Sequence, residues 1–450
     1  MIQTGLIQNA HNDLVTDAVY DFYGLRLATC SLDQRIKVWR LEESTGTWTV
    51  EDDWKAHDAP VSKLSWAHPE FGSVIASASF DRTVKIWEQS VQTALDQQQN
   101  ANNAGSGPST TRWVERAVLP DARGTIRCVE FAPHHFGLKL ATIATDNVLR
   151  IYECLEQPTL SSWQLIDEID IVNAIPGPSP SHLSRAQTAA LATPTQTHAT
   201  LDGASASLVA QALQQNLQQQ NASGVSGSIP QSRATLGNRE ADGGWTLSWC
   251  KDRYWGEIVA AGAGNNGIIK VVQLNSRRSQ VLLTLDASPV GSGAAEPQQQ
   301  QPSAGGEAAG QSAGAQQQQN ANVYSVASVA WAPSCGRSYH LIATGSRDGH
   351  VRIWKVKPPP EDSMDEDGHE HEEKWSAAIV GDFDHHKSAV GRVEWNITGT
   401  VLSSAGNDGR IRLWKAGLNS VWKPAGSIGV EQTAEEPAGQ PEAKDVEMET

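Results

Sequence analysis

The chain has 450 residues, of which 39% are hydrophobic, and a formal net charge of −16 at pH 7. That length and apolar content allow one large domain or two ordinary ones with a buried core. The negative charge would repel phosphate backbones and anionic lipid, so we expect protein partners and no direct binding to nucleic acid. The sequence shows no secretory signal, no apolar run long enough to span a membrane and no CxxC pair among its five cysteines. We therefore expect a reduced intracellular protein without a membrane span.

A hairpin pattern recurs along the chain. Five copies end in an aromatic residue: LATCSLDQRIKVW at Trp39, IASASFDRTVKIW at Trp87, LATIATDNVLRIY at Tyr152, IATGSRDGHVRIW at Trp354 and LSSAGNDGRIRLW at Trp414. An aspartate lies six residues before each of these aromatics, at Asp33, Asp81, Asp146, Asp348 and Asp408. A weaker sixth copy, IVAAGAGNNGIIKVV, has Asn266 and Val272 in the two places. Each copy predicts a small apolar strand, a tight turn at Asp or Asn, and an alternating second strand.

Two further strands flank each hairpin. The upstream strands end in an aromatic residue, at Tyr20, Trp66, Phe131, Trp249, Trp331 and Trp395. The downstream strands are expected at 47–54, 112–119, 163–169, 281–285, 375–383 and 421–428. Four antiparallel strands repeated around a ring form the blades of a β-propeller. The predicted fold is therefore an all-β WD40 β-propeller over residues 1–429, with blades at approximately 11–54, 57–119, 123–169, 243–285, 323–383 and 386–428.

Long segments of low complexity interrupt this pattern. They cover 89–111, 173–242, 287–322 and 358–373, and an acidic tail follows at 430–450. These segments are rich in Gln, Ala, Ser, Gly, Asn or Glu, and they cannot bury enough apolar surface to offset the entropy of the chain. We expect them to be disordered loops on the rim of the propeller, followed by a disordered tail.

One short stretch near the N-terminus is left over. It consists of Thr4, Gly5, Leu6, Ile7 and Gln8. Its sequence is typical of a strand. Blade six does not need this strand, because it already has its own outer strand at 421–428. The stretch would therefore belong to a seventh blade, whose other three strands the chain does not encode. Unpaired sheet edges attract other strands. The pattern predicts an open six-bladed ring that a partner completes in trans, with residues 4–8 as partner-binding positions. The alternative is a closed six-bladed ring with a frayed N-terminus.

Four segments resemble a known family in sequence features that the general WD repeat does not require. They are SWAHPEFGSVIASASFDRTVKIWE (65–88), FAPHHFGLKLATIATDNVLRIYE (131–153), WAPSCGRSYHLIAT (331–344) and VEWNITGTVLSSAGNDGRIRLWKA (393–416). Together they resemble the Seh-one nucleoporins, the pore-specific relatives of the COPII coat propeller Sec-thirteen. The AHPEFG phrase is shared with the coat paralogue, whereas WNITGT and the RIYE ending point to the nucleoporins. The long inserts and the weak fourth blade depart from the family pattern.

The resemblance implies a structural scaffold subunit that is not an enzyme. It implies an open propeller completed by a blade from an α-solenoid scaffold nucleoporin, within the Y-shaped outer-ring subcomplex of the nuclear pore. Pore assembly, nucleocytoplasmic transport, further Y-complex partners and a place at the nuclear envelope follow from it. It also implies a second pool in the SEA/GATOR complex at the vacuolar or lysosomal membrane, which regulates TOR signalling. The alternatives are a COPII-type vesicle coat propeller and a closed-ring WD40 adaptor that recognises peptides.

Histidine, serine or threonine, and aspartate recur together along the chain. The sets are His11 with Ser31 and Asp33, His57 with Ser79 and Asp81, and His386 with Asp408. They could be read as catalytic triads, but a nucleophile needs one poised site and not one in every blade. We expect instead a buried hydrogen-bond network that locks each blade. Its predicted members are His11, Asp33, Trp39, His57, Asp81, Trp87, Asp146, Tyr152, Asp348, Trp354, His386, Asp408 and Trp414.

No catalytic residue, metal ligand or cofactor is predicted. His369 and His371 lie in the acidic segment EDSMDEDGHEHEEK, which is expected to be a solvated loop. Basic residues that alternate with apolar ones along the second hairpin strand, such as Arg410 and Arg412, are expected to lie on solvated strand faces.

Overall fold

The computed structural model describes residues 7–91, 111–157, 159–176, 243–274, 279–287, 324–359, 375–417 and 420–429. In these residues the only helices are two single-turn 3-10 helices, η1 (Pro69–Phe71) and η2 (His134–Phe136), and no helix has the length and apolar character needed to cross a membrane. All other regular elements are β-strands. They belong to one compact unit formed by Met1–Gly177 and Glu240–Thr450.

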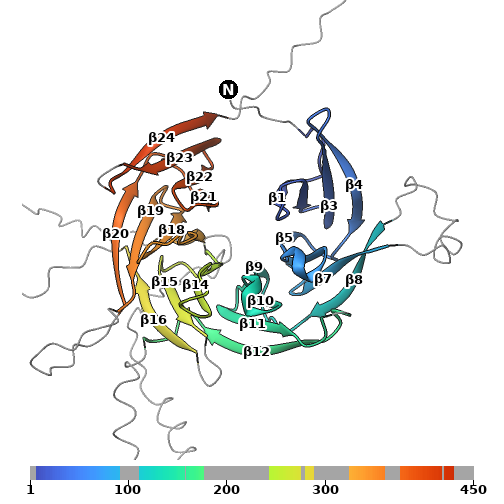
Figure 1. Cartoon of the computed structure of the whole chain (residues 1–450), viewed down its shortest axis with the longest axis horizontal. Helices are drawn as coiled ribbons and strands as arrows, with labels where there is room; N and C mark the ends of the chain where they lie inside the picture. The colour runs from blue at the N-terminus through green and yellow to red at the C-terminus, as the bar shows by residue number, and fades with distance from the viewer. Residues whose placement is uncertain are drawn as a thin grey trace, which may run out of the picture. The chain divides into compact units, whose positions relative to one another are not determined.

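The strands form six four-stranded antiparallel sheets, each in chain order from the centre of the ring to its rim (Figure 1). Blade one holds β1 (Val15–Tyr20), β2 (Arg26–Ser31), β3 (Arg35–Glu42) and β4 (Thr47–Lys55), and blade two holds β5 (Val61–Trp66), β6 (Val74–Ser79), β7 (Val84–Val91) and β8 (Thr111–Leu119). Blade three holds β9 (Ile126–Phe131), β10 (Lys139–Ala144), β11 (Val148–Cys154) and β12 (Trp163–Asp170), and blade four holds β13 (Thr246–Trp249), β14 (Ile258–Gly262), β15 (Ile269–Gln273) and β16 (Gln280–Leu285). Blade five holds β17 (Val326–Trp331), β18 (His340–Ser346), β19 (Val351–Lys357) and β20 (Ser376–Phe383), and blade six holds β21 (Val390–Trp395), β22 (Val401–Gly406), β23 (Arg410–Ala416) and β24 (Trp422–Gly429). The predicted all-β propeller with six blades is confirmed.

The recurring acidic or amide residue shapes the turn between the second and third strand of each blade. In blade one, Asp33 Oδ1 accepts the backbone N–H of Arg35 at 3.0 Å, and Gln34 between them has a φ of 71°. The same bond joins Asp81 to Thr83, Asp146 to Val148, Asn266 to Ile268, Asp348 to His350 and Asp408 to Arg410. A side-chain oxygen that accepts the N–H two residues further on stabilises a tight turn. Asn266 has this oxygen too, which is why blade four keeps its hairpin without the aspartate.

The apolar core lies between neighbouring blades. Five clusters of buried residues fill the junctions from blade one through blade six. At the last of these junctions, Ala343 and Ile353 of blade five pack against Leu402 and Trp414 of blade six. Because a middle blade is covered on both sides, both faces of its sheet are apolar, and this accounts for its nearly continuous runs of small and branched apolar residues.

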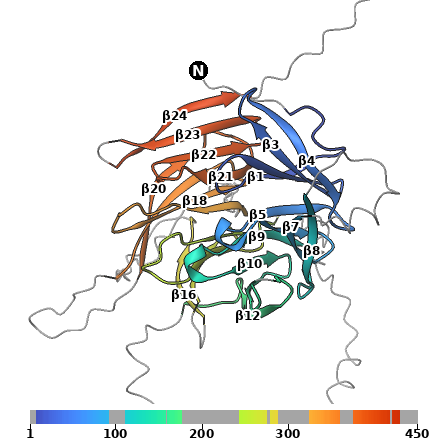
Figure 2. The same ribbon diagram turned by 45° about the vertical axis from the view of Figure 1, so that its right-hand side comes forward.

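The junction between blade six and blade one differs from the other five. No cluster of buried apolar residues joins these two blades within the described part of the chain. The innermost strands pack in the series β1, β5, β9, β13, β17 and β21, but β21 and β1 do not show the same packing. Figure 1 shows these two blades at the place where the ring begins and ends, and Figure 2 shows β24 and β4 as the outer strands on its two sides. We call this place the open junction.

The leftover N-terminal stretch does not close blade six in the described residues. Ile7 has no regular structure and Gln8 lies in a turn, so the expected strand is not present at these two positions. Thr4, Gly5 and Leu6 lie outside the described residues. All four strands of blade six come instead from residues 390–429.

Two insert boundaries also differ from the prediction. β7 continues to Val91, so residues 89–91 belong to a strand, where the side chain of Gln89 bonds to Arg26 and Glu51 of blade one. Residues 173–176 are described as well, and a small bridge pairs Pro176 with blade four. These side-chain and backbone contacts cannot be inferred from the composition of the segments, which is dominated by small and polar residues. The bulk of the four predicted inserts, and the tail, lies outside the described residues.

His340 occupies a buried cage of tryptophans at the start of β18. Its ring centre lies 5.4 Å from that of Trp331, 5.7 Å from Trp255 and 5.9 Å from Trp375. The side chain is 1% exposed, and neither ring nitrogen has a hydrogen-bond partner in the described structure. Burial lowers the pKa of His340 to about 4, and the carboxylate of Asp252 offsets this only in part. The imidazole is therefore neutral in the folded protein at pH 7.

We expect the folded protein to lose stability as the pH falls from about 6.5 to about 4. Above pH 6.5 the imidazole is neutral in both states, whereas below it the unfolded chain binds a proton that folded His340 does not. The gap between the ordinary pKa of 6.5 and the folded value of about 4 corresponds to about 3 kcal/mol at or below pH 4. Urea unfolding of the wild type and of His340→Phe at pH 7.5 and pH 4 measures this loss. Equal losses in the two proteins would exclude His340 as its source.

Candidate functional site at the open junction

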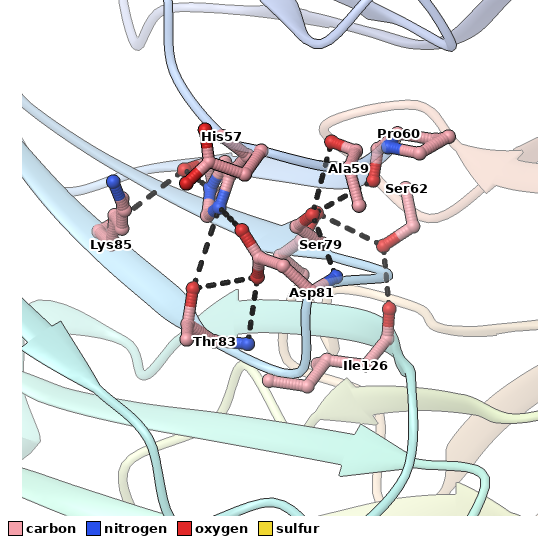
Figure 3. Close-up of polar contacts among 12 residues, drawn as sticks. His57, Ala59, Pro60, Ser62, Ser79, Asp81, Thr83, Lys85 and Ile126 are labelled. Carbon is pink, nitrogen blue, oxygen red and sulfur yellow. Dashed lines mark hydrogen bonds and ion pairs between the residues drawn. The ribbon is translucent and has the colours of Figure 1, made fainter.

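The predicted blade network is best seen in blade two. His57 Nδ1 lies 2.8 Å from Asp81 Oδ2, and His57 Nε2 lies 2.7 Å from Ser77 Oγ. Trp87 Nε1 donates to the same Ser77 hydroxyl at 2.9 Å. Burial would raise the pKa of Asp81, but the hydrogen bonds from His57 and Thr83 outweigh it and hold the pKa below its usual range (Figure 3). These contacts join β6, β7, the turn between them and the loop that precedes β5.

The hydroxyl partners differ from those predicted. His11 Nε2 lies 2.8 Å from Thr29 Oγ1, and not against Ser31. Ser79, two residues after the hydroxyl that meets His57, donates instead to the carbonyl oxygens of Ala59 and Pro60 and accepts the N–H of Asp81 (Figure 3). The predicted Ser31 and Ser79 therefore lie two residues after the hydroxyl residues that contact the histidines, Thr29 and Ser77, on the same face of the same strand.

The other predicted members of the network lie where the same pattern places them. Trp39 Nε1 donates to Thr29 Oγ1 at 2.9 Å, and His11 Nδ1 lies 3.0 Å from Asp33 Oδ2. In blade six, Trp414 Nε1 donates to Ser404 Oγ at 2.9 Å, and His386 lies 2.7 Å from the same hydroxyl and 3.0 Å from Asp408. Blade six thus repeats the geometry of blades one and two.

Arginine replaces histidine in blades three and five. Arg150 Nη2 lies 2.7 Å from Asp146 Oδ2, and Arg352 Nη2 lies 2.8 Å from Asp348 Oδ2. Trp354 still donates to Thr344 at 3.1 Å in blade five, whereas blade three has the buried Tyr152, whose pKa is raised by burial and by nearby Asp121. The corresponding Arg412 of blade six also pairs with its turn aspartate, Asp408. The prediction of a solvated strand face is therefore wrong for Arg412.

This geometry suits a structural role better than a catalytic one. The side chains of His57 and Ser77 are buried, so a substrate could not reach the hydroxyl. The same arrangement occurs in three blades, which a single reaction would not require. Among the described residues, no group of three or more His, Cys, Asp or Glu is placed to hold a metal ion.

The open face of blade six lacks the cover that the same face has in blade five. In blade five, Ala343, Val351 and Ile353 are fully buried against blade six. Counted from the turn aspartates Asp348 and Asp408, the equivalent residues are Ser403, Ile411 and Leu413. Ile411 is 38% exposed, and the other two are half-buried. The face of blade six that corresponds to a buried face in blade five is thus exposed at the open junction.

The face of blade one across the open junction includes exposed aromatic and apolar side chains, beside the charged Lys37 and Asp53. Successive residues of a strand point to opposite faces, and Val19 packs into the junction with blade two, so Tyr20 points toward the open junction. Tyr20 is 59% exposed, and its ring centre lies 5.8 Å from that of Trp48. Val50, 51% exposed, pairs with Trp39 on the same sheet. The two sides of the open junction therefore both present apolar surface.

One ion pair crosses the open junction at its innermost edge. Asp17 Oδ1 on β1 lies 2.7 Å from Arg392 Nη1 on β21 and 3.1 Å from Lys63 Nζ on β5. Asp17 Oδ2 also accepts the N–H of Leu64 at 3.0 Å, and the Asp17 side chain is 1% exposed. Burial would raise the pKa of Asp17, but attraction to Lys63 and Arg392 outweighs it and lowers the pKa. This carboxylate joins blades six, one and two, and in the described part of the chain neither a backbone hydrogen bond nor a buried apolar cluster accompanies it across the open junction.

This group was not predicted from the sequence, although the inner strands carry a signal for it. The six equivalent residues, three before the last aromatic of each inner strand, are Asp17, Lys63, Cys128, Thr246, Ser328 and Arg392. Thr246 and Ser328 accept an N–H from the next blade, of Val329 and Val393 respectively. Lys63 and Arg392 have no acceptor atom at this position, and both bind Asp17 instead. In the order of the blades, these two cations lie on either side of the one carboxylate in the set, and this charge pattern is the signal for the group.

Comparison with known proteins agrees with the propeller fold and with the resemblance to the nucleoporins. A WD-domain, G-beta repeat model matches residues 3–40, 48–88, 316–355 and 378–415. Nucleoporin SEH1 of Saccharomyces cerevisiae is 30% identical over 452 residues, covering 94% of this chain and 99% of that protein. Nucleoporin seh1 of Schizosaccharomyces pombe is 30% identical, covering 96% of this chain and 98% of that protein. Nucleoporin SEH1 of Homo sapiens is 31% identical, with 93% and 86% covered.

Proposed function

Because this chain belongs to the family of SEH1 nucleoporins, we propose that it is a non-catalytic structural subunit of the nuclear pore complex. The observation that carries the mechanism is the open junction, where two blade faces lack the apolar cover found at the other five junctions. Sheet edges and faces of this kind bind added strands from another chain. A partner that inserts strands between blades six and one would complete the ring as a seventh blade.

The family resemblance supplies the finer proposal. The inserting partner is an α-solenoid scaffold nucleoporin, and the two proteins belong to the Y-shaped outer-ring subcomplex at the nuclear envelope. A second pool belongs to the SEA/GATOR complex at the vacuolar or lysosomal membrane, where it takes part in the regulation of TOR signalling. Purification of the tagged full-length chain from its own cells, followed by identification of the proteins recovered in stoichiometric amount, tests both assignments. Recovery of coat proteins alone would favour the COPII-type alternative.

We expect Ile411→Glu to weaken binding of the stoichiometric partner by roughly a hundredfold. The carboxylate would be buried without a partner group in an apolar contact on the open face of blade six. The fold should persist because Ile411 is already 38% exposed, and exposed substitutions usually change stability little. Affinity measured by calorimetry or interferometry with the purified partner checks the expected loss.

Ile397→Glu provides the matched control. Ile397 is 90% exposed at the turn between β21 and β22, so this variant adds the same charge to the same blade away from the open face. We expect it to bind the partner as the wild type does. Equal binding by all three proteins would refute the insertion mechanism and favour a closed-ring adaptor that holds peptides elsewhere on the propeller.

A further inference from the structure

Blade six is basic, in contrast to the chain as a whole. Its basic residues are Lys387, Arg392, Arg410, Arg412, Lys415 and Lys423, and its acidic residues are Asp384, Glu394 and Asp408. The three acidic residues are all engaged by Lys387, Arg392 or Arg412. In the described structure, no carboxylate pairs with Lys415 or Lys423. Blade six therefore has an excess of positive charge beside the open junction, in a chain whose formal net charge is −16.

Lys415 and Lys423 oppose each other on the open face. They are direct partners in the register of β23 and β24, so their side chains lie on the same face of the sheet. Trp414 and Trp422, their chain neighbours, are buried toward blade five, which places both lysines on the side of the open junction. Both lysines are exposed. Like charges directly opposite each other destabilise a strand pair unless an anion lies between them.

The other blades do not have two opposed cations at the position equivalent to Lys415, although Arg35 and Lys55 are partners at the other end of β3 and β4 in blade one. The residues equivalent to Lys415 are Arg40, Glu88, Glu153, Gln273 and Lys355, and across the strand pair they meet Thr49, Val114, Gln164, Gln280 and Ala378. Each of these pairs has at most one charged member. At this position, the opposition of two lysines occurs only in blade six among the described blades.

Blade one shows how this protein holds two opposed cations. Arg26 and Arg40 are direct partners in the register of β2 and β3, and the carboxylate of Glu51 bridges them at 2.6 Å and 3.3 Å. Arg26 also donates to Gln89 of the following blade at 2.9 Å. At this edge of the ring, a cation on one blade thus meets an acceptor on the next.

Blade three repeats this crossing contact. Lys139 Nζ lies 2.6 Å from Glu257 Oε1 of blade four. In both cases the acceptor comes from the blade that follows. At the open junction the following blade would be the inserted one, and the described chain offers no acceptor there.

We propose that Lys415 and Lys423 bind acidic side chains on the strand that the partner inserts beside blade six. The proposal rests on the proposed function, since it names the chemistry of the same partner. The inserted strand presents apolar residues to Ile411 and Leu413, and an aspartate or glutamate at the edge where the two lysines lie. The carboxylate bridges the two lysines in the way that Glu51, from blade one itself, bridges Arg26 and Arg40. Its role is to set the register of the inserted strand, because a slip by one residue would remove the carboxylate from this face.

The test uses the full-length chain and the stoichiometric partner recovered with it. We expect the double variant K415E/K423E to bind the partner roughly tenfold more weakly at low salt, and the difference to shrink at high salt. K357E/K387E is the control, because it makes the same change in net charge at two exposed lysines outside β23 and β24, Lys357 at the end of β19 and Lys387 in the loop before β21. Reversal of the acidic residue on the partner's inserted strand to lysine should restore binding to K415E/K423E. Treatment of the partner with phosphatase should leave the wild-type affinity unchanged.

Three results would overturn the inference. Wild-type affinity of K415E/K423E would do so, as would the absence of rescue by the reversed partner. Loss of wild-type binding after phosphatase treatment would assign the anion to a phosphate group instead. The Ile411→Glu variant separates this inference from the proposed function. If Ile411→Glu fails to bind the partner while K415E/K423E binds normally, the insertion mechanism is supported and the charge pairing is refuted. If both variants bind normally, the insertion mechanism itself is refuted.

Discussion

Replacing Asp17 with alanine is expected to lower the free energy of unfolding by about 3 kcal/mol. The substitution leaves Lys63 and Arg392 close together without their shared carboxylate, and it removes the acceptor for the N–H of Leu64. Loss of one partner of a buried ion pair commonly costs about 3–5 kcal/mol. The lower end applies here because the side chains of Lys63 and Arg392 are about one-third exposed, so water can solvate part of the released charge.

Chemical denaturation at pH 7 measures this loss, with Asp384→Ala as the control. Asp384 also pairs with a lysine, Lys387, but it is exposed, so its removal should change the midpoint little. The effect of Asp17 is tied to its ionised form. Since its folded pKa is below the ordinary 3.8, the stabilisation is present above pH 3.8 and is lost as the pH falls through the lower folded value. Equal midpoints for wild type and Asp17→Ala would show that the ion pair across the open junction is not stabilising.

Arg392→Met separates the local role of Asp17 from its role across the open junction. Asp17 keeps Lys63 and the N–H of Leu64 in this variant, so blades one and two remain joined, but the link to blade six is lost. The distance between spin labels on Val50 and Val421, both exposed, should become more broadly distributed. An unchanged distribution would mean that other contacts fix the spacing of the two blades.

The strand pattern could be predicted from the sequence because it depends on local chemistry. Each inner strand ends at the predicted aromatic, from Tyr20 in β1 to Trp395 in β21. Each hairpin turns at the predicted Asp or Asn, since the side-chain oxygen and the left-handed residue after it are properties of a few neighbouring residues. The number of blades follows from counting these hairpins.

The partners of the histidines could not be fixed in the same way. Ser77 and Ser79 point to the same face of β6, because they are two residues apart. The alternation of side chains therefore does not determine which serine contacts His57. The contact depends on the position of the loop that carries His57, between β4 and β5. The same ambiguity separates Thr29 from Ser31 in blade one.

The charged contacts at the open junction depend on long-range geometry. Asp17 and Arg392 are 375 residues apart in the chain, and nothing local to either predicts their contact. Arg412 was expected in solvent because it alternates with apolar residues, but alternation places it on the face that holds Asp408 and His386. A basic residue on a strand is solvated only where its own face is open, and the sequence does not show which blade face is covered.

Ser77→Ala is expected to lower the free energy of unfolding by about 2–3 kcal/mol, although it removes a single oxygen atom. The ionised carboxylate of Asp81 can only accept, so it takes the Nδ1–H of His57 and leaves Nε2 to accept the hydroxyl of Ser77. Trp87 Nε1 donates to the same oxygen. Alanine thus leaves one buried acceptor and one buried donor without a partner, and each costs about 1–3 kcal/mol when water cannot replace the lost bond.

Ser77→Thr is the matched control, because Thr29 has the same position and the same two bonds in blade one. It should retain the network and most of the stability. Ser404→Ala should repeat the loss of Ser77→Ala, since blade six has the same distances from its serine to His386 and Trp414. Thermal and urea unfolding of the three variants would measure these effects. Similar losses in blades two and six would mean that the repeated His, Ser and Asp sets hold the blades together; a loss of function in only one of them, with folding intact, would instead indicate a single reactive site.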